Sequence, residues 1–103
     1  MWAQLITARL KPGKEADLPK LFEQVQAAEQ PGSGLVRSIA MQDQSDPSKV
    51  MMLVVFESEE KARAREQDER RQERLVDARA TMAAMFDGSQ EFVDLNVIND
   101  FQP

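Results

Sequence analysis

Residues 49–56, KVMMLVVF, form the most apolar segment of the chain and include seven consecutive apolar residues at positions 50–56. A strand with one face in water alternates apolar and polar side chains, and this segment does not. We therefore predict a strand that is covered on both faces.

The flanking segments predict the order strand, helix, strand, strand, helix, strand. The other three strands are expected over residues 2–11, 35–42 and 90–99, and the polar connection 43–48 makes a hairpin with the strand 49–56. A helix is predicted over 14–29. Pro19 fits its first turn if the helix begins near Asp17 or Leu18, and bends it if the helix begins near Lys14.

The second helical region follows Ser58, a suitable N-cap. Thirteen of the eighteen residues 57–74 are charged, which predicts a solvated surface with close ion pairs. From Leu75 a new apolar stripe begins, so a phase change near Gln72 predicts two helical pieces.

Arg9 and Arg37 are charged residues inside the first two predicted strands. They are either edge charges, paired with Asp94 or with a carboxylate of a partner chain, or groups that stabilise an anionic oxygen of a ligand.

This element order is that of an α+β, ferredoxin-like βαββαβ split sandwich, in a single domain over residues 1–103. Both helical regions are then expected on one face of the sheet. Because the strand 49–56 and the first strand are apolar on both sides, the bare face predicts a homodimer that packs sheet against sheet.

Composition excludes several functional classes. The chain of 103 residues has no Cys, His or Tyr, so it offers no disulfide, thiolate nucleophile or imidazole base. We expect no metal and no cofactor, and no catalytic residue can be assigned. The net charge of −5 makes nucleic acid an unfavourable partner, and no apolar run is long enough to cross a membrane. Without a visible secretory signal, a cytoplasmic location is expected.

Three parts of the chain resemble the antibiotic biosynthesis monooxygenase (ABM) family: ARLKPGKEADLPKLF (8–22), MQDQSDPSKVMMLVVFES (41–58) and the charged helix after them. The resemblance implies a dimeric α+β barrel. It also implies one of several activities, since some members oxidise polycyclic phenols without a cofactor, some oxidise quinols and some degrade haem. The haem-degrading branch uses an asparagine, a tryptophan and a histidine. This chain has Ala8 and Phe56 at the first two positions and no histidine, which disfavours haem degradation.

Two functions are therefore expected. The first is a cofactor-independent monooxygenase acting on a small aromatic or quinol substrate. The alternative is a non-catalytic dimeric module of the same fold that binds a small ligand or is structural; a protein-docking role for the charged helix is a lesser third. An open cavity with polar groups among apolar walls favours the enzyme, and a cavity filled by Met and Phe favours the module. The candidate ligand-binding residues, each of which could instead be core or interface, are Trp2, Phe22, Phe56, Met82, Phe86 and Asn96.

Overall fold

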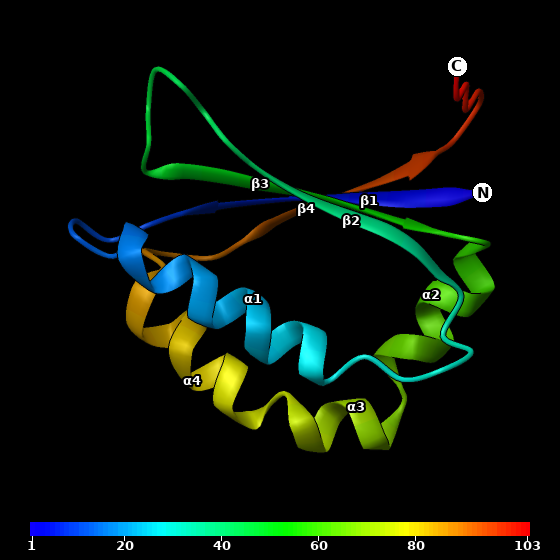
Figure 1. Cartoon of the computed structure of the whole chain (residues 1–103), viewed down its shortest axis with the longest axis horizontal. Coiled ribbons are helices and arrows are strands. Elements are labelled where there is room, and N and C mark those ends of the chain that lie inside the picture. Colours follow the sequence, from blue (N-terminus) through cyan, green and yellow to red (C-terminus); the bar gives the residue numbers. More distant parts are fainter.

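The computed structural model describes all 103 residues and contains one four-stranded antiparallel sheet (Figure 1). Its strands are β1 (Trp2–Arg9), β2 (Leu35–Gln42), β3 (Lys49–Phe56) and β4 (Glu91–Asn96). They lie in the order β2-β3-β1-β4. This is the predicted ferredoxin-like α+β arrangement.

The helices all lie on one face of the sheet (Figure 1). They are the short 3-10 helix η1 (Glu15–Asp17) and the α-helices α1 (Leu18–Ala27), α2 (Glu59–Glu66), α3 (Glu69–Arg74) and α4 (Val76–Met85). Pro19 lies in the first turn of α1, as the first of the two alternatives predicts. None of these helices is both long enough and apolar enough to cross a bilayer.

The charged region differs from the prediction of two helical pieces with a break near Gln72. It contains two breaks, the first after Glu66 and the second at Leu75. At the first break the Asp68 side chain accepts a hydrogen bond from the backbone N–H of Arg70 at 3.0 Å and so starts a new helix. Ser58 caps α2 as predicted, accepting from the N–H of Lys61 at 3.2 Å.

Side chains alternate between the two faces of the sheet. Even-numbered residues of β1 and β3 point toward the helices, and odd-numbered residues point away. The pairing of Leu5 with Leu53 and of Gln4 with Val54 keeps this alternation in step across the two central strands. The surface away from the helices also carries Arg37 of β2. We call its apolar part the free face; it is formed by Ala3, Leu5, Thr7, Ile39, Met41, Met51, Leu53, Val55, Val93 and Leu95.

The free face is apolar and no element of the chain covers its centre. The register places Ile39 opposite Leu53, Leu53 opposite Leu5, and Leu5 opposite Val93, so one apolar row crosses all four strands. Leu53 is only half-buried and Val93 is exposed. On the helix side, in contrast, Val54 is buried. On the free face of segment 49–56, Met51 and Leu53 therefore stay partly exposed in the single chain, although Val55 is buried.

The core consists of two separate groups of buried residues. The larger lies around Leu21 and Met85, between α1, α4 and the start of β3. The smaller contains Trp2, Val54 and Phe56 packed under α2. Residues of both groups line a single cavity, so the helices do not close fully on the sheet between them.

Candidate ligand cavity

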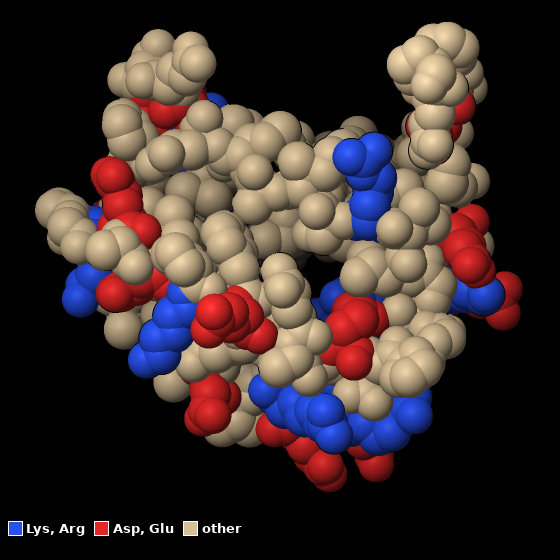
Figure 2. Space-filling view, in the orientation of Figure 1, with Lys and Arg blue, Asp and Glu red and all other residues tan.

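A cavity of about 680 Å³ lies between the helix side of the sheet and helices α1 to α4. Figure 2 shows it as a dark hollow with basic and acidic side chains beside it. Its volume falls in the range of sites for small organic ligands. The walls are mostly apolar, and side chains of Met and Phe line the cavity without filling it. The sequence analysis expected an open cavity for an enzyme and a filled one for a non-catalytic module, so this open cavity favours the enzyme.

Five of the six predicted ligand-binding residues line this cavity; they are Trp2, Phe22, Phe56, Met82 and Phe86. Asn96 does not. It ends the edge strand β4, is exposed, and lies beyond the cavity wall, so we leave it out of the site. Ala8, where haem-degrading relatives are expected to carry asparagine, also lines the wall. A role in binding for these residues stays a prediction.

Two aromatic rings form the wall nearest α2. The ring centroids of Trp2 and Phe56 are 6.0 Å apart with an interplanar angle of 42°. Arg63 lies over the Trp2 ring at 5.1 Å, and Arg65 lies over the Phe56 ring at 5.3 Å. Such cation–π contacts restrain both partners. Trp2 and Phe56 are only 6% and 4% exposed, so they form a rigid aromatic part of the cavity wall.

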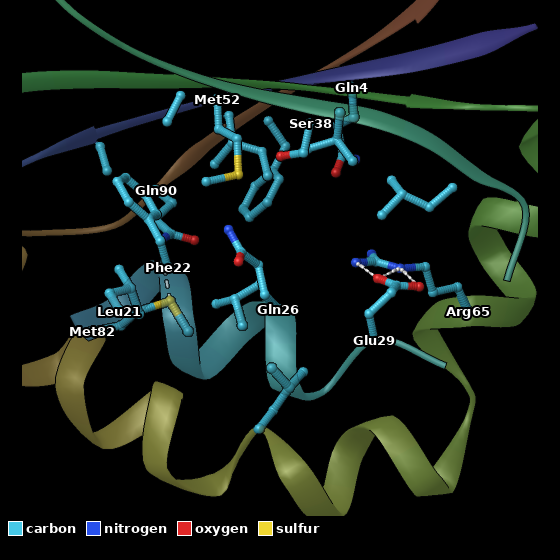
Figure 3. Close-up of a pocket in the computed structure, with 18 of the residues that line it drawn as sticks. Gln4, Leu21, Phe22, Gln26, Glu29, Ser38, Met52, Arg65, Met82 and Gln90 are labelled. Atoms are coloured by element: carbon cyan, nitrogen blue, oxygen red, sulfur yellow. Dashed lines mark hydrogen bonds and ion pairs between the residues drawn. The ribbon is translucent and has the colours of Figure 1, made fainter. Parts of the chain in front are cut away.

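Four uncharged polar side chains point into the cavity from different elements (Figure 3): Gln4 of β1, Gln26 of α1, Ser38 of β2 and Gln90 before β4. The Gln4 amide also donates to the Asp94 carboxylate at 3.0 Å. Amide and hydroxyl groups can orient the oxygen atoms of a ligand, but they do not act as bases near neutral pH. No group of three or more acidic side chains is placed to hold a metal ion.

A salt bridge between Glu29 and Arg65 occupies one end of the cavity (Figure 3). Arg65 donates to one Glu29 oxygen from two nitrogens, at 2.7 and 3.0 Å. The two side chains are only 25% and 11% exposed. Burial raises the pKa of Glu29, but hydrogen bonds from Arg65 and Ser33 outweigh it and hold this pKa below 4.5. Glu29 is therefore an ionised partner of Arg65 and not a free base.

This salt bridge makes the stability of the fold depend on pH in a defined direction. Because the pKa of Glu29 is lower in the folded chain than in the unfolded chain, its contribution is present above 4.5 and is lost as the pH falls through the folded value. We expect Glu29→Gln to lower the unfolding free energy by about 1 kcal/mol at pH 7, and much less at pH 3. Urea unfolding of both proteins at the two pH values measures this, and an equal difference at both would contradict it.

The surroundings of several charged residues differ from those predicted from the sequence. Arg65 and Arg71 line the cavity, so the prediction that residues 57–74 are solvated throughout is wrong at these positions. Arg9 pairs with Asp46 at 2.9 Å, and not with Asp94. Asp94 pairs with Arg63 at 2.8 Å. Periodicity could not single out these partners, because each lies more than thirty residues away along the chain.

The fold and the cavity together define a ferredoxin-like α+β protein with a ligand-sized, mostly apolar space between its sheet and helices. The family model of antibiotic biosynthesis monooxygenases matches residues 1–74, which include β1 to β3 and helices α1 to α3. The chain belongs to this family.

Solved structures share this fold over almost the whole chain. A protein from Nitrosomonas europaea assigned to the antibiotic biosynthesis monooxygenases is 17% identical with a TM-score of 0.75, and the match covers 96% of this chain and 100% of that one. SnoaB, a cofactor-independent oxygenase from Streptomyces nogalater, is 12% identical with a TM-score of 0.73, with 99% and 97% covered. No curated protein matches the sequence. At these identities the structural matches support the fold.

Proposed function

We propose that the protein is a homodimeric, cofactor-independent monooxygenase that acts on a small aromatic or quinol substrate, as a single cytoplasmic domain of residues 1–103. The observation that carries this proposal is the open cavity of about 680 Å³, with aromatic walls and a few inward-pointing polar groups. Family membership and the likeness to SnoaB support it.

In this reaction the substrate itself reduces oxygen. A phenol or quinol that has lost its proton donates electrons to O₂. One oxygen atom enters the product, which becomes a quinone or hydroxyquinone, and the other leaves as water with two hydrogens from the substrate. No external reductant is needed, so the tasks left to the protein are orientation and the exclusion of bulk water.

The cavity residues suit these tasks. The pair of Trp2 and Phe56 offers a surface on which a flat ring can stack. Gln26 and Ser38 lie on opposite sides of the space and can hydrogen-bond the oxygen atoms of the substrate (Figure 3). The chain supplies no histidine or tyrosine, so a substrate that ionises readily in water is the most suitable one.

One observation favours the alternative, a dimeric module that binds a small ligand without turnover. Glu29, a partly buried carboxylate at the cavity, is held ionised by Arg65 and so is a poor acceptor for a substrate proton. The same aromatic walls would then hold a ligand that is stored or sensed.

Oxygen uptake by protein freed of metals distinguishes the two. With a panel of quinols and polyphenols, we expect uptake above the uncatalysed rate and one atom of ¹⁸O from ¹⁸O₂ in the product. Ala40→Trp, which fills the cavity from β2, should abolish the excess uptake. Ala83→Trp, at an exposed position of α4 outside the cavity, is the matched control and should retain it. Absence of uptake across the panel, with ligand binding intact, would leave the binding module as the function.

The proposed dimer forms through the free face. Its apolar row of Ile39, Leu53, Leu5 and Val93 is continuous across the sheet, and a twofold axis through the centre would pair this row with its copy. The ABM fold is typically dimeric, which agrees with this arrangement. Burial of the row contributes roughly 25 cal/mol for each Å² removed from water.

A further inference from the structure

Arg71 of α3 is a charged cavity residue for which the chain provides no ion-pair partner. It lines the cavity together with Arg65 and Glu29, and its guanidinium enters none of the salt bridges or side-chain hydrogen bonds of the chain. Its side chain is partly buried, unlike that of Arg74 on the same helix, which is exposed. The nitrogens of this guanidinium reach solvent, so an anion that enters the cavity can replace their water with charge-assisted hydrogen bonds.

The carboxylates near Arg71 are already engaged. Glu29 is bonded twice by Arg65, at 2.7 and 3.0 Å. Glu66, which also lines the cavity, accepts from Arg63 at 3.4 Å and shares that arginine with Glu59 and Asp94. Burial and the positive charge of Arg65 outweigh the attraction of Glu29, so the pKa of Arg71 lies below its ordinary value. This end of the cavity therefore has unused capacity for one negative group.

We propose that the ligand of this cavity is an aromatic acid, whose carboxylate binds Arg71 and whose rings lie against Trp2 and Phe56. The inference rests on the proposed function in one respect only, that the cavity holds the ligand. A carboxylate fits because a guanidinium presents two parallel N–H donors, the spacing that the two oxygens of a carboxylate accept. The apolar walls, which include aromatic rings, favour an apolar ring system for the rest of the molecule.

The polarity of the cavity agrees with such a ligand. Its charged residues gather where α2, α3 and the end of α1 meet, and the walls toward Phe22 and Met82 carry the amide of Gln90 but no charge (Figure 3). The salt bridge with Glu29 also holds Arg65 in place. Arg65 therefore adds positive charge beside Arg71 but does not itself bind the carboxylate of the ligand. A molecule with one acidic end and one apolar end would thus bind in a single orientation.

Calorimetric titration with 2-naphthoate and with its neutral analogue 2-naphthamide tests the inference without requiring turnover. We expect the wild-type protein to bind the naphthoate more tightly. Arg71→Gln should weaken naphthoate binding by roughly tenfold or more and leave naphthamide binding unchanged. Arg74→Gln, which removes the same charge from an exposed position of the same helix, is the matched control and should bind both probes as the wild type does.

Arg71→Lys keeps the charge but loses the paired donors, so we expect intermediate binding. The emission of Trp2, the only tryptophan, reports whether each variant keeps its fold. Three results would each overturn the inference: no binding of naphthoate to the wild type, equal binding of the two probes, or no effect of Arg71→Gln. If the preference depends on Arg71 but no phenol or quinol consumes oxygen, the inference stands and the oxygenase proposal fails. Oxygen uptake with quinols, together with equal binding of naphthoate and naphthamide or naphthoate binding that Arg71→Gln does not change, would do the reverse.

Discussion

Replacement of Leu53 by lysine is expected to convert the proposed dimer into a folded monomer. Leu53 is at the centre of the free face, between Ile39 of β2 and Leu5 of β1. A lysine there would be buried without a counter-charge in the dimer but would lie in water in the monomer. Burial of one unpaired charge costs about 3–5 kcal/mol, which weakens association at least a hundredfold.

The measurement is the molar mass of the variant in solution by light scattering, with circular dichroism to confirm the fold. Val76→Lys makes a similar change at a 62% exposed position of α4, in the helix layer, and should leave the mass of the wild type unchanged. A Leu53→Lys protein that stays dimeric and folded would show that the free face is not the interface.

Val54→Lys, one residue further along β3, is expected to act on the fold instead. Val54 is 6% exposed and points toward the helices, where it packs with Trp2, Phe56 and Ala62. The ammonium group of a lysine at this position would either lose its water inside the core or have to extend into the cavity past Trp2 and Phe56. We expect the unfolding free energy to fall by about 2–4 kcal/mol. Urea unfolding followed by Trp2 emission measures this directly.

The folded fraction of the Val54→Lys protein should keep the mass of the wild type, because its free face is unchanged. The substitutions at Leu53 and Val54 thus test the two faces of β3 independently. Equal stability of Val54→Lys and wild type, or a folded monomer from Val54→Lys, would show that the register has been assigned to the wrong faces.

The strands could be predicted because their signals are local. Both β2 and β3 have the bounds expected from the sequence, since the turn residues at Asp46 and Pro47 and at Gly34 interrupt a continuous apolar pattern. The last strand is shorter than expected, ending at Asn96, because it is an edge strand with all its side chains exposed. The apolar pattern continues beyond it to Ile98, but only one further backbone hydrogen bond follows, from the N–H of Val97 to the carbonyl of Met1 at 3.3 Å.

The cavity could be predicted in part. Alternation along β1 places Gln4 on the same side as Trp2 and Ile6, and a polar residue on an apolar face is a signal of a site. The charged end could not be found in this way. Within residues 57–74, the partly buried Arg65 and the exposed Arg74 have the same chemistry and similar neighbours in the sequence. They differ only in the folded chain, where α2 lies near the end of α1 and Arg65 contacts Glu29.

The central claim is that the sheet has two apolar faces, one closed by helices around a cavity and one closed by a second copy of the chain. The molar mass of the unmodified protein, measured by light scattering at micromolar concentration, tests it most directly. We expect twice the 11.7 kDa of one chain. A mass of 11.7 kDa at every concentration, with the protein folded, would contradict the claim.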